Sequence, residues 1–144
     1  MGTAEPIQIL VLCTGNSCRS IFAEALFRQL AGDLIEVTSA GSQPAGVVNP
    51  HTIRVLDEQG IAHDWACSKS MTEFLDREFD HVITFCDDAA EVCPVFPGPA
   101  LRTHWSIPDP ALASGSEEHQ MSVYRATFDD LGQRIAGFLD TLDR

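Results

Sequence analysis

The chain has 144 residues, 44% of them apolar and 21% charged, with a formal net charge of −12. This length and composition are typical of a single globular domain over residues 1–144, and the acidic excess argues against nucleic acid or an anionic membrane surface as a partner. The sequence has no apolar run of the ~20 residues that span a membrane and no basic segment typical of a signal peptide. Five cysteines without zinc-ligand spacing indicate reduced thiols, a cytoplasmic location and no structural metal.

Apolar runs alternate with amphipathic segments along the chain. Strands are expected at residues 7–12, 35–40, 81–85 and 101–105, and helices at residues 21–31, 50–59, 72–78, 87–93 and 117–142. Ser20 can cap the first helix, and Gly32 lies just beyond its end. Strands that alternate with helices predict an α/β fold with a parallel sheet, which binds its ligands at the carboxyl ends of the strands.

The segment Cys13-Thr-Gly-Asn-Ser-Cys-Arg19 joins the first predicted strand to the first predicted helix. Its small residues let the backbone curl so that successive N–H groups point at one centre, and the helix adds the positive end of its dipole. The Arg19 guanidinium can bind two oxygens of a tetrahedral oxyanion. The same positive field favours a thiolate at Cys13, to which Ser20 can donate a hydrogen bond. The alternative is a buried cysteine beside a surface arginine. The residues expected to bind the oxyanion are Thr14, Gly15, Asn16, Ser17, Cys18, Arg19 and Ser20.

Three stretches carry a resemblance to a known family: CTGNSCRS with the following IFAEALF, then CDDAAEVCPVFPG, and then THWSIPDPA. Together they resemble the low-molecular-weight protein tyrosine phosphatases, and the last two resemble the arsenate reductase branch of that family. The resemblance extends over essentially the whole chain and implies a three-layer α/β/α fold around a four-stranded parallel sheet. It also implies that Asp109, between two prolines, is a general acid, although an aspartate before proline is by itself often a turn former.

The downstream thiols separate reduction from ester hydrolysis. A phosphatase needs a nucleophile, an anion site and a general acid, whereas a reductase needs further thiols to carry two electrons away. We expect Cys13 to attack arsenate, Asp109 to protonate the departing oxygen, and Cys86 to attack the sulfur of Cys13 as arsenite leaves. Cys93 then attacks Cys86, and a Cys86–Cys93 disulfide remains. If residues 87–93 are helical, they must partly unwind, because two helical turns separate these cysteines by ~10 Å.

The final disulfide needs an external reductant. The resemblance implies thioredoxin, with glutaredoxin, glutathione or mycothiol as the thiol in relatives, and no tightly bound cofactor. We expect a monomer that takes arsenate as substrate and phosphate or sulfate as analogues. A phosphatase of phosphotyrosine or small phosphate esters stays open, although Ala111 and Leu112 replace the aromatic residues that phosphatases place after the Asp-Pro. A thiol sensor or oxyanion-binding module without turnover is a third possibility.

The remaining thiols also have simple alternatives. One of Cys86 and Cys93 can be merely a small buried apolar residue. Cys18 is expected to be structural or a minor redox participant, and Cys67, near Trp65, is expected to be inert.

A possible cation site lies beside the loop. Asn16, Glu24 and Ser39 match positions that hold the loop and a potassium ion in some reductases of the family. The fourth such position, an aspartate in those relatives, is Lys69 here. Its ammonium group can occupy the place of the cation and pair with Glu24, and the alternative is a solvated surface lysine.

Overall fold

The computed structural model describes residues 5–86 and 95–142. Four parallel strands form one sheet in the order β2-β1-β3-β4: β1 (Ile7–Cys13), β2 (Ile35–Gly41), β3 (His81–Thr84) and β4 (Leu101–His104). The helices are α1 (Arg19–Ala31), α2 (Pro50–Glu58) and α3 (Glu117–Leu142), with 3-10 turns η1 (Gly32–Leu34), η2 (Met71–Phe74) and η3 (Pro110–Leu112). The predicted four-stranded parallel sheet is confirmed.

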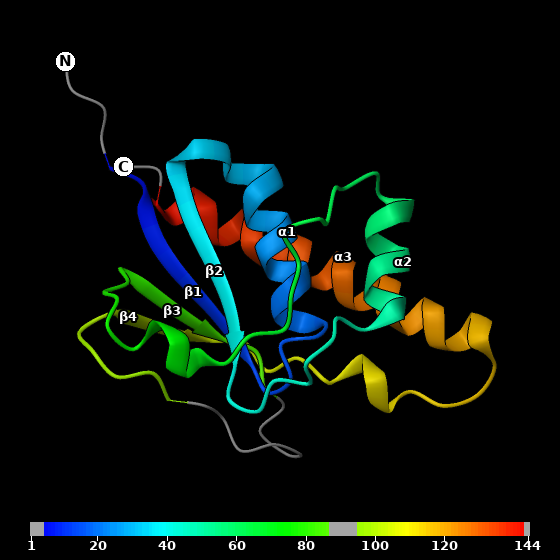
Figure 1. Ribbon diagram of the computed structural model, residues 1–144. Coiled ribbons are helices and arrows are strands. Elements are labelled where there is room, and N and C mark those ends of the chain that lie inside the picture. The colour runs from blue at the N-terminus through cyan, green and yellow to red at the C-terminus, as the bar shows by residue number, and fades with distance from the viewer. Residues whose placement is uncertain (1–4, 87–94, 143–144) are drawn as a thin grey trace.

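Strand β1 is buried on both faces along most of its length, as its largely apolar sequence predicts. Ile9 and Val11 belong to the apolar cluster that the sheet forms with α1, α2 and α3. Leu10 and Leu12 point to the other face, where a second cluster contains Phe96 and packs against apolar side chains of η2. Figure 1 shows the three labelled helices on one side of the sheet. One face of the sheet is therefore covered by the three helices, and the other face by the second cluster.

Helices α1 and α3 pack closely against each other. The rings of Phe22 and Phe128 meet edge to face, with centroids 5.2 Å apart. Leu131 and Ile135 of α3 are also fully buried, as the apolar side of the predicted helix requires. None of the helices in residues 5–86 and 95–142 has an apolar stretch long enough to cross a membrane.

Two predicted helices differ from the structure. Helix α1 begins at Arg19, so Ser20 lies inside its first turn and does not cap it. The predicted helix at residues 72–78 is only the turn η2, after which Arg77 packs over the rings of Phe74 and Phe79 and donates to Gln8 of β1. These contacts hold the segment against the sheet, away from a helical path. The helix predicted at residues 87–93 lies outside the described part of the chain.

The sheet order positions the loop that follows β1. Because β1 is central, with β2 and β3 as its parallel neighbours, the chain after Cys13 emerges where the connections diverge to the two sides. The carboxyl ends of the strands meet at one edge, at the lower centre of Figure 1. The segments after Cys13 and Gly41 are hydrogen-bonded to each other at this edge.

Candidate active site

The loop between β1 and α1 is held from outside through its carbonyl oxygens. Segment 42–49 supplies four backbone donors: Ser42 N to Cys13 O (3.3 Å), Gln43 N to Thr14 O (2.9 Å), Ala45 N to Gly15 O (2.9 Å) and Asn49 N to Ser17 O (3.1 Å). In a trans peptide the carbonyl and the next N–H point in opposite directions. The amides that follow these four carbonyls therefore turn to the inner side of the loop, which is the arrangement of an anion-binding nest.

Asn16 gives the loop its tight curl. Its φ of 47° lies in the left-handed region, which asparagine tolerates better than most residues. The buried side chain accepts from Lys69 N (2.7 Å) through Oδ1 and donates from Nδ2 to Ser20 Oγ (2.7 Å). Gly41 allows the close approach of β2, because a Cβ there would lie 2.5 Å from Thr14 O.

Cys13 and Ser20 close the two ends of the loop. Cys13 Sγ lies 3.0 Å from Ser20 Oγ, and both residues are buried. The Asn16 amide nitrogen can only donate, so the Ser20 oxygen accepts from it and the hydroxyl proton is left to donate to the sulfur. This contact matches the hydrogen bond predicted between Ser20 and Cys13.

Arg19 lies where three segments meet. One guanidinium nitrogen, Nη1, donates to Phe85 O (3.2 Å) and to Ile107 O (3.0 Å), and Nη2 lies 3.7 Å from Asp109 Oδ2. The arginine is 2% exposed, which is unusual for a charged side chain without such partners. Asp109 also accepts from Ala111 N (2.9 Å) and so begins the turn η3. The aspartate is therefore a turn former and a neighbour of Arg19 at once.

Cys86 follows the strand that neighbours β1. Phe85 N donates to Leu12 O (3.0 Å), which continues the ladder one residue beyond β3 and places Phe85 opposite Cys13. Cys86 is fully buried and disulfide-bonded, whereas Cys13, Cys18 and Cys67 are free thiols. Cys93 lies outside the described residues, so its role stays a prediction.

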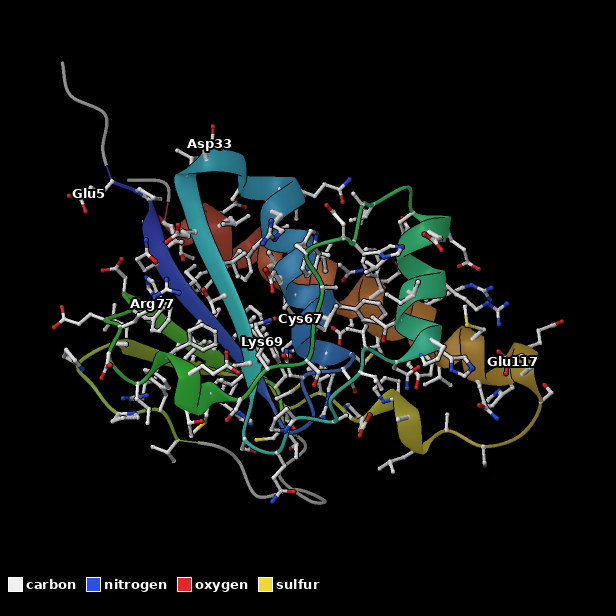
Figure 2. The ribbon with its side chains drawn as sticks, in the orientation of Figure 1. Glu5, Asp33, Cys67, Lys69, Arg77 and Glu117 are labelled. Atoms are coloured by element: carbon white, nitrogen blue, oxygen red, sulfur yellow. The ribbon has the colours of Figure 1, made fainter. Side chains whose placement is uncertain are left out.

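The side chains matched to a cation site lie together but are already bonded to one another. Glu24 accepts from Ser39 Oγ (2.6 Å) and pairs with Arg28, whose Nη2 lies 2.8 Å from Oε2. Lys69 Nζ donates to Ser39 Oγ (3.4 Å) and to Cys67 O (3.0 Å). Figure 2 shows Lys69 beside the carboxyl end of β2. Glu24 is thus neutralised mainly by Arg28, which the sequence prediction did not include.

Two hydroxyls that the prediction missed also bind the loop. Ser68 Oγ donates to Gly15 O (2.9 Å) and accepts from Gly46 N (3.1 Å). Thr52 Oγ1 donates to Ser17 O (3.0 Å). Both lie more than thirty residues from the loop, and no local motif marks them; only the tertiary fold brings them to it.

The fold and the arrangement of the loop after β1 can be compared with those of known protein families. Residues 8–144 match the model of the low molecular weight phosphotyrosine protein phosphatases. The chain belongs to this family, and its residues 7–31 form a strand, a C-x5-R loop and a helix in succession.

The more particular resemblance is to arsenate reductases. The chain is 41% identical over 133 residues to an arsenate reductase of Halalkalibacterium halodurans, covering 92% of this chain and 95% of the relative. An arsenate reductase of Bacillus subtilis is 38% identical over the same shares of the two chains. The crystal structure of an arsenate reductase from Archaeoglobus fulgidus superposes with a TM-score of 0.75 at 27% identity, covering 92% of this chain and 98% of that one. The resemblance expected from the sequence is confirmed.

One solved relative is described by its reductant. A thioredoxin-dependent arsenate reductase of Corynebacterium glutamicum superposes with a TM-score of 0.64 at 30% identity. The match covers 93% of this chain and 64% of that longer one.

Proposed function

We propose that the protein is a cytoplasmic, monomeric arsenate reductase that works by successive thiol attacks. The observation that carries the proposal is the arrangement around Arg19. Its guanidinium joins the oxyanion loop, the Asp109 segment and the carbonyl of Phe85, the residue just before Cys86. Cys13, Asp109 and Cys86 therefore lie in segments that meet at one edge of the sheet, which supports the roles proposed for them.

The chemistry follows from these positions. The loop amides and Arg19 bind arsenate, and the sulfur of Cys13 displaces one arsenate oxygen, which leaves as water after Asp109 supplies a proton. In the reduced enzyme, in which Cys86 is a free thiolate, Cys86 then attacks the sulfur of Cys13. The electron pair of the S–As bond moves to arsenic, arsenite leaves, and a Cys13–Cys86 disulfide forms.

The remaining steps return the enzyme to its reduced state. The thiolate of Cys93 attacks Cys86, which frees Cys13 and moves the disulfide to Cys86 and Cys93. An external dithiol reduces that pair. Thioredoxin is the proposed donor, supported by the description of the Corynebacterium relative, and glutaredoxin or a low-molecular-weight thiol is the alternative.

The test is arsenate-dependent NADPH oxidation with thioredoxin, glutaredoxin and glutathione systems supplied in turn. Cys13→Ser, Cys86→Ser and Cys93→Ser should each abolish steady-state turnover, whereas Cys67→Ser, which removes the exposed thiol, should retain it. Full turnover by Cys86→Ser would contradict the cascade. No arsenate-dependent oxidation with any donor would contradict reduction itself.

The family description favours one alternative activity, hydrolysis of phosphate esters through Cys13, Arg19 and Asp109. Such hydrolysis needs no second thiol. Cys86→Ser should therefore retain any cleavage of p-nitrophenyl phosphate while losing arsenate reduction, and Cys13→Ser should lose both. A chain that hydrolyses esters efficiently but never reduces arsenate would be a phosphatase.

The cation site does not fit a potassium ion. The oxygens of Glu24 and Ser39 already accept hydrogen bonds, and two cationic side chains, Arg28 and Lys69, border them. We therefore infer that this protein holds its loop with internal cations. Arsenate turnover should be the same in potassium chloride and in choline chloride of equal ionic strength, and strong activation by potassium alone would contradict the inference.

A further inference from the structure

Thr52 is a fully buried polar residue in the first turn of α2. Its Oγ1 donates to Ser17 O at 3.0 Å, and Asn49 N donates to the same oxygen at 3.1 Å. The carbonyl of Ser17 thus receives two hydrogen bonds from the beginning of one helix.

Thr52 also contacts Cys18, the residue that follows Ser17. Its side chain lies next to the thiol of Cys18. Burial raises the pKa of this thiol well above its ordinary value, and the contact with Thr52 opposes the rise only in part.

The position of Thr52 is itself well fixed. Asn49 caps α2 through His51 N (2.8 Å) and donates from its amide to Tyr124 Oη of α3 (3.0 Å). The His51 ring stacks on Tyr124, with centroids 4.8 Å apart. Helix α2 is therefore tied to α3, and the hydroxyl it presents to the loop has little freedom.

The peptide between Ser17 and Cys18 is trans, like every described peptide bond. Fixing the direction of its carbonyl therefore fixes the opposite direction of the Cys18 N–H, toward the inner side of the loop. We propose that Thr52 is a positioning residue, which aims the Cys18 amide at the bound oxyanion from outside the loop. The proposal rests on the proposed function, because it assumes that the loop binds a tetrahedral oxyanion.

The test compares three substitutions in the full chain. Thr52→Val removes the hydroxyl at nearly constant shape, Thr52→Ser keeps it, and Thr127→Val is a matched control that removes a hydroxyl–carbonyl bond of 2.9 Å within α3. Calorimetric titration with inorganic phosphate should show about tenfold weaker binding for Thr52→Val, as expected for one misaligned hydrogen bond to an anion. Thr52→Ser and Thr127→Val should bind as the wild type does.

Two further readouts separate positioning from a general loss of stability. In arsenate turnover, Thr52→Val should raise KM by about the same tenfold factor and change kcat much less, since binding rather than chemistry is weakened. In amide NMR spectra, phosphate should shift the Cys18 N–H resonance strongly in the wild type and weakly in Thr52→Val. If Thr52→Val does not fold, Thr52→Ala is measured in the same way.

The outcomes are distinguishable. If the wild type and Thr127→Val bind phosphate but Thr52→Val binds equally well with an unchanged Cys18 shift, the positioning role is wrong and the oxyanion site stands. Equal weakening by Thr52→Val and Thr52→Ser would also overturn the role of the hydroxyl. If the wild type binds neither phosphate nor arsenate, the proposed function itself fails.

Discussion

Cys13 and Cys18 lie in one loop, yet their surroundings give them different chemistry. Both are nearly inaccessible, at 2% and 3% exposure. Cys13 lies next to the Ser20 hydroxyl and begins the loop whose carbonyls are held by segment 42–49. Cys18 is packed in the apolar cluster under α1, where burial raises its pKa and keeps it protonated. This supports the expectation that the Cys18 side chain is structural.

The burial of Cys18 and the exposure of Cys67 predict an order of alkylation. With iodoacetamide near pH 8, Cys67, an exposed free thiol, should react readily, whereas Cys18 should react only after the protein is unfolded in urea. Peptide mass spectrometry gives the extent of labelling at each site, and Cys67→Ser shows whether prior labelling there affects the rest. Labelling of native Cys18 as fast as Cys67 would contradict the assignment.

Helix α2 is a short helix whose first turn is hydrogen-bonded to the loop after β1. Asn49 caps it, and Pro50 occupies its first position, where a missing N–H costs nothing. Burial raises the pKa of Tyr124 to about 12, so its hydroxyl stays protonated at neutral pH while it accepts from Asn49. The stability of this one helix start therefore depends on a local cap and on a contact with α3.

The two contributions can be measured separately. Asn49→Ala should lower the free energy of unfolding by about 2 kcal/mol, since a lost cap costs about 1 kcal/mol and a lost hydrogen bond about 1 kcal/mol more. Asn49→Asp keeps the capping oxygen but loses the amide donor, so it should cost less. Urea denaturation measures the free energy of unfolding of each variant. Tyr124→Phe is the control for the hydrogen bond from the Asn49 amide to Tyr124. Equal losses for alanine and aspartate would show that the cap contributes nothing.

At the scale of the whole molecule, the chain has a net charge of −12, yet its candidate site contains a buried arginine. Arg19 is almost inaccessible at the carboxyl edge of the sheet, and Arg28 pairs with the buried carboxylate of Glu24. The positive charge at this edge of the sheet is therefore local, and the acidic surface does not supply it.

The opposite edge of the sheet contains a group that links stability to pH. His81, at the start of β3, has a buried Nδ1 that makes no hydrogen bond with the described residues, and its ring meets Phe138 edge to face. Desolvation lowers its pKa, and the neighbouring Asp80 opposes this only in part. The folded state therefore favours the neutral ring, so the stability it contributes is present above the ordinary pKa of 6.5 and is lost as pH falls below it.

This predicts that the urea concentration at the midpoint of unfolding decreases when the pH is lowered from 7.5 to 5.5. In His81→Gln the decrease should be smaller, because glutamine does not titrate. His63→Gln, at a partly exposed ring paired with Asp57, serves as the control. An unchanged pH dependence in His81→Gln would rule out this histidine as a source of the effect.

The sequence by itself determined the parts of this protein that depend on neighbours along the chain. The apolar run before Cys13, the small residues of the loop, Arg19 and the amphipathic pattern of residues 117–142 each report local geometry, and β1, the loop and α3 follow from them. Local propensity misled at residues 72–78, where contacts of Arg77 with the sheet outweigh helix formation, and at Ser20, whose hydroxyl serves Asn16 and Cys13.

Only the tertiary structure decided which distant side chains complete the site. Thr52 and Ser68 bind loop carbonyls, and Arg28 rather than Lys69 neutralises Glu24. Hydrogen bonds of this kind depend on the placement of whole elements, so a hydroxyl in the first turn of α2 looks the same in the sequence whether or not it meets the loop. The thiol loop could therefore be found by its spacing, whereas the groups that direct its amides could not.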